Sequence, residues 1–231
     1  MRRSYGQHCT LARALDVVGE RWTFLIVREL LVRPKRFGEL VDGLPGMGRN
    51  LLSARLQHLE AEGLVQRRST ESDGSRVYRL TADGMGLAPA LTELSRWGVA
   101  RMGRLRPGDA FQGQWVMGTM VATADLDAAH GVRETYEFHV EGDAFHLRVD
   151  DGGVTARVGR AQEPDLVIRT RPEVLADIAT GDRSVVDAVE QRELAVDGSP
   201  AALEHVLAIF GPAWGLERAG STSDAEPGHP S

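Results

Sequence analysis

The sequence predicts an α+β protein of 231 residues, in which a helix-rich N-terminal module precedes a module that mixes helices with a sheet. Helical periodicity dominates the first hundred residues, and strand-like alternation dominates the middle of the remainder. The net charge also changes sign. Residues 1–104 hold 17 Lys and Arg against 11 Asp and Glu, whereas residues 105–231 hold 10 against 22. This asymmetry predicts two modules with different partners, of which only the basic one suits a polyanion.

Composition predicts where the modules begin and end. We expect one module over residues 1–104, a linker with Pro and Gly over 105–113, a second module over 114–216 and a disordered polar tail over 217–231. The sequence holds no stretch approaching the roughly 20 apolar residues of a membrane span, and it begins without a signal-peptide pattern. A single cysteine, Cys9, favours a cytoplasmic location.

Four helices are predicted in the first module, over residues 11–18, 22–31, 37–41 and 49–62. Gly63 and the leucine after it are placed to end the fourth helix in a Schellman motif. The third and fourth helices are joined by a glycine-rich turn and therefore form a helix-turn-helix pair.

Two short strands, over 65–68 and 77–80, follow this pair and are joined by a hairpin tip at 72–75. A long helix is predicted over 87–102. Helices followed by a two-stranded hairpin make a winged helix-turn-helix, which is a DNA-binding architecture.

The fourth helix has two faces of opposite chemistry. Three leucines share one narrow stripe, and Asn50 and Gln57 lie on the opposite side, where they are positioned to reach base edges in a major groove. Arginines beside this face and on the wing, Arg79 included, are suited to phosphate, although single arginines on a surface are often only solvated. The residues predicted to contact DNA are Lys35, Arg36, Arg49, Asn50, Ser53, Ala54, Arg55, Gln57, Arg67, Arg68 and Arg76.

The motifs Gly19-Glu-Arg-Trp-Thr23, Asn50-Leu-Leu-Ser-Ala-Arg-Leu56, Leu59-Glu-Ala-Glu-Gly-Leu64 and Tyr78-Arg-Leu-Thr-Ala-Asp-Gly84 make residues 5–103 resemble bacterial HxlR-type regulators. The resemblance implies a homodimer, built on the first and last helices of the module, that binds a two-fold symmetric operator. Gly48-Arg49 replaces the Ser-Pro that the family commonly has, which weakens the helix cap. Candidate dimerisation residues are Leu11, Leu15, Leu87, Leu91, Leu94 and Trp97.

The stripe that ends at Trp97 supports a dimer on physical grounds, because a lone winged helix has little core left to cover it. The alternative is that it packs on the second module.

Cys9 offers a different control point, since many relatives carry a cysteine there and some of these sense oxidants or electrophiles. It stands at a helix start beside His8, with Arg13 four residues on. The alternative is a small buried hydrophobe.

The second module is predicted to contain a β-hairpin over residues 136–149, centred on Gly142-Asp143. With that turn, Phe138 faces Leu147 on an apolar side and His139 faces His146 on the other. Two histidines do not make a metal site, so we expect an exposed cross-strand pair and no metal. Further strands are predicted at 154–159, 165–169 and 193–196, with helices at 172–179, 184–189 and 200–210.

The stretches Pro164–Thr170, Pro172–Gly181 and Glu193–Leu203 make residues 115–211 resemble the sterol-carrier-protein-like fold. This resemblance implies a curved, mainly antiparallel sheet that encloses a hydrophobic tunnel with its helices, and hence an apolar effector. The alternative is that the same residues are simply core. Candidate lining residues are Trp115, Met117, Met120, Phe138, Phe145, Ile178 and Trp214.

Three functions follow from these patterns. The first is a DNA-binding regulator, acting as a homodimer in the cytoplasm on the nucleoid, that responds to an apolar small molecule. The second is a regulator switched through Cys9. The third is a small-molecule carrier or enzyme with an accessory helix-turn-helix. The sequence has no GxSxG, HExxH, P-loop or GxGxxG motif, so we expect no enzyme activity, no cofactor and no membrane partner.

Overall fold

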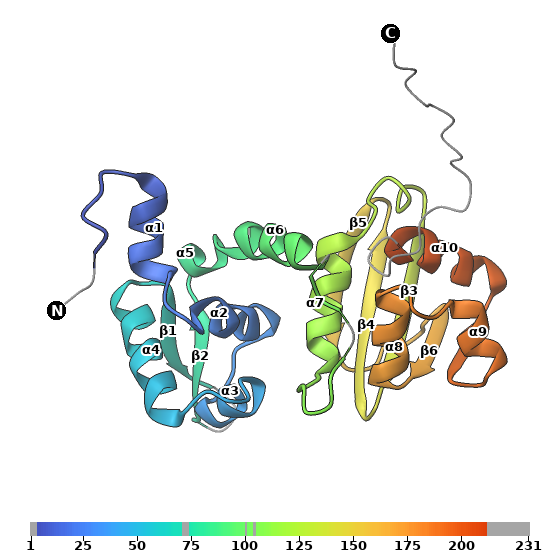
Figure 1. The fold of residues 1–231 in the computed structure, drawn as a ribbon, viewed down its shortest axis with the longest axis horizontal. Helices are drawn as coiled ribbons and strands as arrows, with labels where there is room; N and C mark the ends of the chain where they lie inside the picture. Colours follow the sequence, from blue (N-terminus) through green and yellow to red (C-terminus); the bar gives the residue numbers. More distant parts are fainter. Residues whose placement is uncertain (1–3, 71–73, 100, 104, 212–231) are drawn as a thin grey trace, which may run out of the picture. The chain divides into compact units, whose positions relative to one another are not determined.

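A computed structural model describes residues 4–70, 74–99, 101–103 and 105–211 of the chain (Figure 1). The chain divides into two compact units, Met1–Arg101 and Met102–Ser231, called here the N-terminal and C-terminal units. The predicted tail at 217–231 and Trp214 lie outside the described residues. No helix in the described part of the chain is both long and apolar enough to cross a bilayer.

The N-terminal unit is a winged helix-turn-helix (Figure 1). Its core consists of buried Leu, Ile, Val and Met side chains from the helices and from both wing strands. The elements are α1 (Thr10–Val18), α2 (Thr23–Val32), α3 (Phe37–Gly43), α4 (Arg49–Ala61), β1 (Val65–Ser69), β2 (Arg76–Leu80), α5 (Ala82–Met85) and α6 (Ala88–Val99).

The helix predicted over 87–102 is present as α6 but is shorter at its C-terminal end, and it is preceded by a short helix, α5, that the apolar periodicity does not indicate. The Thr81 hydroxyl accepts a hydrogen bond from the Gly84 backbone N–H at 3.1 Å and so starts the short helix α5, which ends at Gly86. Helix α6 then begins at Ala88 with Pro89 in its first turn, where a proline is tolerated. It ends at Val99, so Met102 lies beyond it.

Within residues 105–211, the C-terminal unit combines a five-stranded sheet with four helices. The strand order is β5-β4-β3-β6-β7, and every neighbouring pair is antiparallel except β3 with β6. Helices α7 and α8 lie in front of the sheet in Figure 1. The elements are α7 (Gly113–Thr123), β3 (Arg133–Val140), β4 (Asp143–Asp150), β5 (Gly153–Val158), β6 (Leu166–Thr170), α8 (Pro172–Ala179), α9 (Val185–Glu190), β7 (Leu194–Gly198) and α10 (Pro200–Phe210).

One face of this sheet forms the core of the unit. Tyr136, Phe138, Phe145 and Leu147 are all at most 1% exposed, as the period-2 alternation predicted. The Phe138 and Phe145 rings stack with centroids 5.0 Å apart, and the Tyr136 ring meets Phe210 of α10 edge-on at 6.1 Å. The mixed α+β class predicted for the chain is confirmed.

The predicted register of the β3–β4 hairpin is wrong by two positions. The turn consists of Glu141 and Gly142, with φ of 44° and 91°, and two positive φ angles are what a two-residue type I′ turn requires. Phe138 therefore pairs with Phe145, and His139 pairs with Ala144 instead of His146. A shift of two positions keeps each side chain on its predicted face, so the apolar face was still identified.

Candidate nucleic-acid interface

The fourth helix, α4, carries the predicted division between a buried and an exposed face. Leu52, Leu56 and Leu59 are at most 1% exposed, whereas Asn50 and Gln57 are exposed. Ala54 lies on the same exposed side, and Ser53 beside it is half-buried. The exposed side of α4 is therefore a short polar strip, and the opposite side of the same helix packs into the core.

The two ends of α4 are stabilised differently. At the C-terminal end, Gly63 has φ of 75°, and the Leu64 N–H donates to the Leu59 carbonyl at 2.9 Å, which is the Schellman pattern. At the N-terminal end, Gly48 provides no side-chain cap, and Arg49 lies over the Phe37 ring at 5.5 Å. The first backbone N–H groups of α4 are thus left without a side-chain acceptor from its N-cap, which suits a helix end that meets phosphate.

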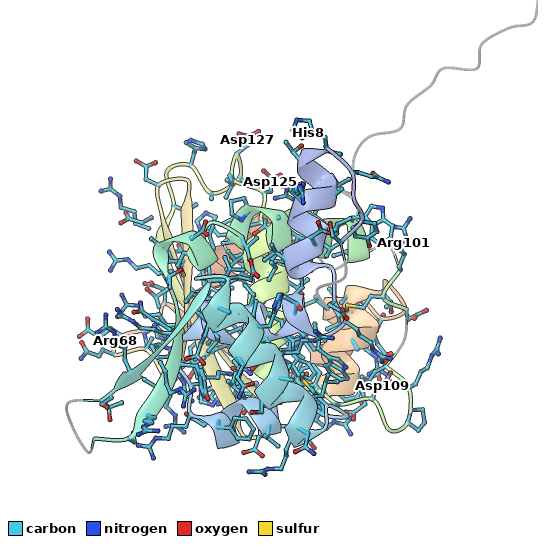
Figure 2. All side chains as sticks on the ribbon, turned by 90° about the vertical axis from the view of Figure 1, so that its left-hand side faces the viewer. His8, Arg68, Arg101, Asp109, Asp125 and Asp127 are labelled. Atoms are coloured by element: carbon cyan, nitrogen blue, oxygen red, sulfur yellow. The ribbon has the colours of Figure 1, made fainter. Side chains whose placement is uncertain are left out.

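The wing places its arginines on both faces. Arg67 lies over the Tyr78 ring at 5.4 Å and its Nη2 is 3.1 Å from the Glu60 carboxylate, whose hydrogen bond raises the pKa of Arg67. Arg68 points the other way, and Figure 2 shows it projecting from the edge of the unit. Arg76 and Arg79 on β2 are also exposed. The predicted tip at 72–75 is described only from Gly74 onward.

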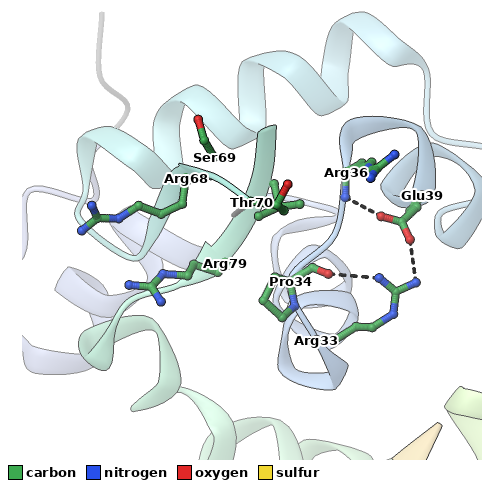
Figure 3. A pocket seen from close by; sticks show the side chains of 9 residues that line it. Arg33, Pro34, Arg36, Glu39, Arg68, Ser69, Thr70 and Arg79 are labelled. Carbon is green, nitrogen blue, oxygen red and sulfur yellow. Dashed lines mark hydrogen bonds and ion pairs between the residues drawn. The ribbon is translucent and has the colours of Figure 1, made fainter. Parts of the chain in front are cut away.

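A pocket of about 440 Å³ lies between the wing and the segment before α3 (Figure 3). Arg33 Nη2 donates to Glu39 at 2.6 Å, and this hydrogen bond is the main reason why the pKa of Glu39 is lowered. In Figure 3, Arg68 and Arg79 extend away from that pair. The lining thus contains four arginines and one carboxylate, which leaves the pocket cationic. It is lined by Arg33, Pro34, Arg36, Glu39, Arg68, Ser69, Thr70, Val77 and Arg79.

Lys35 does not lie where the phosphate assignment requires. It is 3% exposed, and its Nζ is 2.5 Å from the Glu29 carboxylate, which is itself fully buried. The backbone of Lys35 exchanges two hydrogen bonds with Tyr78, at 3.0 and 2.8 Å, and so ties the segment before α3 to strand β2 by an isolated β-bridge. We therefore correct the prediction that Lys35 contacts DNA. Its side chain is buried in an ion pair, where it stabilises the fold and does not reach the surface.

Two further residues of this unit, Glu29 and Arg33, carry a signal in the sequence. Glu29 follows Ile26 by three positions on an otherwise apolar helix face, which is the spacing of a buried side chain. Gly43 faces it closely, because a Cβ there would lie 2.5 Å from the Glu29 carboxylate. Arg33 belongs to a basic run that ends at Arg36.

Arg55 has a carboxylate partner within the unit. Its guanidinium is 2.7 Å from Glu20, and its side chain is only 21% exposed. A phosphate would have to compete with that carboxylate, so Arg55 is less available than Arg49 or Arg68, which are exposed.

Helix α6 has no buried residue. Leu87 and Leu91 pack partly against the core, whereas Leu94 is 50% and Trp97 60% exposed. The Arg101 guanidinium covers one side of the Trp97 ring at 3.6 Å.

The first helix and Cys9 complete the set of predicted control and dimerisation residues. On α1, Leu11 is 65% exposed and Leu15 is half-buried. Cys9 occupies the N-cap position of that helix and is exposed in the single chain.

Five of the predicted lining residues in the C-terminal unit pack in its core, where each is at most 6% exposed: Met117, Met120, Phe138, Phe145 and Ile178. Trp115 is half-buried on α7. The structure therefore places five of the candidates in the interior of the unit, where the Phe138 and Phe145 rings stack on each other.

Residues 17–105 match the HxlR-like helix-turn-helix family, and residues 119–211 match the SCP-2 sterol transfer family. The uncharacterized HTH-type transcriptional regulator YvaP of Bacillus subtilis is 42% identical over 86 residues, which cover 37% of this chain and 80% of YvaP. The uncharacterized HTH-type transcriptional regulator Rv3095 of Mycobacterium tuberculosis is 46% identical over 90 residues, covering 38% of this chain and 56% of that protein. The reduced form of the transcriptional regulator YodB from Bacillus subtilis shares 30% identity with a TM-score of 0.37, covering 45% of this chain and all of that one.

Proposed function

This chain is a transcriptional regulator that belongs to the HxlR-like helix-turn-helix family, and we propose that it binds a two-fold symmetric DNA operator as a homodimer. The observation that carries this proposal is the exposed strip of α4. Asn50 and Gln57 stand on a helix whose opposite face is locked into the core by three leucines. An amide side chain can pair bidentately with adenine in the major groove, so this strip supplies the base readout.

Phosphate contacts come from the basic elements around the strip. Arg36, Arg49, Arg67, Arg68 and Arg76 are exposed and lie on the segment before α3, on α4 and on the wing. These contacts position the protein without reading sequence. A dimer doubles them, so we expect the logarithm of the association constant to fall with the logarithm of salt concentration at a slope steeper than about −4.

The homodimer is supported by the apolar surface of α6. Leu94 and Trp97 expose half or more of their area on a helix without a single buried residue. Exposed apolar patches of this kind mark association surfaces. Leu11 on α1 adds to the candidate interface, in which α1 and α6 of each copy participate.

The experiment is a selection of operators from random double-stranded DNA, followed by salt titration on the selected sequence. A palindromic consensus with the steep slope is expected. The Trp97→Ser variant tests the dimer, with Trp115→Ser in the C-terminal unit as the matched control. Sedimentation should give a monomer for the first variant and a dimer for the second. A flat slope, or a wild-type monomer that selects an asymmetric site, contradicts the proposal.

We further propose that an apolar small molecule in the C-terminal unit controls DNA binding, with 114–216 as the ligand-binding domain and 105–113 as the linker. The match of residues 119–211 to the SCP-2 sterol transfer family supports this proposal. Native mass spectrometry of the purified chain tests it, and a co-purifying apolar molecule is the expected result.

The competing hypothesis is a thiol switch at Cys9, which is exposed at the start of α1. Cys9→Ser separates the two hypotheses, because release of the operator by an oxidant or electrophile requires the thiol. Release that is unchanged in Cys9→Ser rules out the thiol switch, and loss of release supports it. A carrier or enzyme with an accessory helix-turn-helix predicts no sequence-selective DNA binding at all.

A further inference from the structure

The sheet face opposite the core of the C-terminal unit carries a second feature, a polar hollow of about 560 Å³. This volume falls in the range of small-molecule sites. The hollow is lined by Thr135, His146, Arg148, Thr155, Arg157, Arg160, Ala161, Gln162 and Glu163.

The strand register explains how the lining side chains come together. On one row across the sheet, Arg148 of β4 pairs with Thr135 of β3 and with Thr155 of β5. On the next row, His146 pairs with Arg157 of β5. All five alternate with residues that face the core side, and so point to the same outer face. Because strands carry them, their positions are fixed before any ligand arrives.

A crossing segment, residues 159–163, forms the wall of the hollow. The Gly159 N–H donates to the Ala144 carbonyl at 2.7 Å, and His146 Nδ1 donates to the Gly159 carbonyl at 2.9 Å. The Ala161 N–H donates to the carboxylate of Glu137 at 2.6 Å, and Glu137 is only 5% exposed. A buried carboxylate therefore ties the wall to the sheet.

The charge of the hollow opposes that of its surroundings. Three guanidinium groups line it together with one carboxylate, that of Glu163, within a part of the chain that holds 10 Lys and Arg against 22 Asp and Glu. The buried Glu137 carboxylate beneath the wall is paired with His139 and also attracts Arg160, so the arginines still outnumber the nearby carboxylates. Arg148 reaches Asp150 only at 3.6 Å. Arg157 and Arg160 have no salt bridge within the described part of the chain. Arg148 and Arg157 are diagonal neighbours on adjacent strands, roughly 7–8 Å apart, where like charges repel.

We propose that this hollow binds the phosphate group of a small soluble molecule. Arginine offers a planar fork of donors that matches phosphate oxygens, and the two threonine hydroxyls and the Gln162 amide supply further donors. A doubly charged anion offsets the repulsion among the arginines. The hollow and the proposed apolar ligand site lie on opposite sides of the sheet and differ in chemistry. Phosphate binding at the hollow is measured without DNA, so its test is independent of the proposed operator binding.

The test is a ¹H–¹⁵N NMR titration of the full-length chain with inorganic phosphate, at constant ionic strength, with acetate in a parallel series. Phosphate is expected to shift the amides of residues 146–148 and 155–161 in a saturable manner, with acetate at least tenfold weaker. Shifts confined to the N-terminal unit, or equal shifts with both anions, overturn the proposal.

The Arg157→Gln/Arg160→Gln double variant should weaken phosphate binding at least tenfold. Arg169→Gln is the matched control, because it removes an exposed arginine from the same sheet face outside the hollow and should leave affinity within twofold. Equal loss in both variants would mean general electrostatic attraction and would refute the site. Co-sedimentation with phosphatidic acid vesicles that depends on Arg157 and Arg160 would assign the hollow to a lipid headgroup, which also refutes a soluble ligand.

Discussion

The two units of this chain hold their candidate functional residues in opposite environments. In the N-terminal unit, Asn50 and Gln57 are exposed polar side chains on the far side of a buried leucine stripe. In the C-terminal unit, candidates such as Met120 and Phe138 are buried and indistinguishable by residue type from ordinary core. An exposed recognition surface can be identified because its chemistry departs from that of a core. A tunnel lining cannot, because both roles require the same apolar side chains.

Lys35 is the clearest exception to this comparison, because it is a basic residue of the N-terminal unit whose side chain is buried. Lys35→Ala should lower the free energy of unfolding by about 3–5 kcal/mol, because it breaks a buried ion pair and leaves the Glu29 carboxylate paired with the partly exposed Arg28 guanidinium at 2.8 Å. Urea denaturation measures this change. Arg79→Ala, an exposed arginine of the wing, should cost less than about 0.5 kcal/mol. A Lys35→Ala protein of unchanged stability that binds DNA weakly would restore the phosphate assignment.

The second prediction concerns Phe138, whose side chain either belongs to the core or lines a ligand tunnel. Truncating a packed phenylalanine removes burial and leaves a cavity, so Phe138→Ala should destabilise the C-terminal unit by about 3–5 kcal/mol. Hydrogen exchange resolved by peptide should show reduced protection in residues 113–211 and no change in 10–99. A change below about 1 kcal/mol, together with loss of a co-purifying apolar molecule, would favour the tunnel.

Within the N-terminal unit, Asn50 and Arg68 should respond differently to the same truncation. Asn50→Ala should reduce by about 1–3 kcal/mol the discrimination between the selected operator and a variant in which the base pair read by Asn50 is changed. Arg68→Ala should weaken binding to both sequences alike and make the salt slope shallower by about 0.9 for each phosphate that this arginine neutralises. Fluorescence anisotropy on both duplexes measures these quantities, and identical behaviour of the two variants would contradict the groove assignment.

The smallest expected effect concerns Glu39 at the wing pocket. Its pKa is lowered in the folded protein, chiefly by the hydrogen bond from Arg33, so its ionised form stabilises the fold above the unfolded pKa near ~4.3. That stabilisation disappears as the pH falls through the folded pKa. The side chain is 36% exposed, so the amount is below about 1 kcal/mol. The difference in thermal unfolding between the wild type and Glu39→Gln should be full at pH 7 and should shrink as the pH falls below the unfolded pKa.

Several elements could be predicted because they depend on neighbours within one or two turns. The bounds of α8 and α10 agree with the predicted 172–179 and 200–210, since each begins with proline in its first turn. Helix α4 ends at Ala61, two residues before Gly63, whose positive φ closes the Schellman motif. The helix predicted over 87–102 is present as α6 but ends at Val99, and the short helix α5 before it has no apolar repeat that would reveal it in the sequence.

By itself, the sequence determined which faces of its elements are apolar, because side-chain periodicity follows from backbone geometry alone. It therefore determined the exposed strip of α4 and the core face of the β3–β4 hairpin. Only the tertiary structure decided that Lys35 pairs with Glu29, that the hairpin turns at Glu141 and Gly142, and that residues 159–163 cross a cluster of arginines. Each of these outcomes depends on residues that come into contact only through packing. Where several local arrangements have similar energy, burial and the pairing of charges decide which one forms.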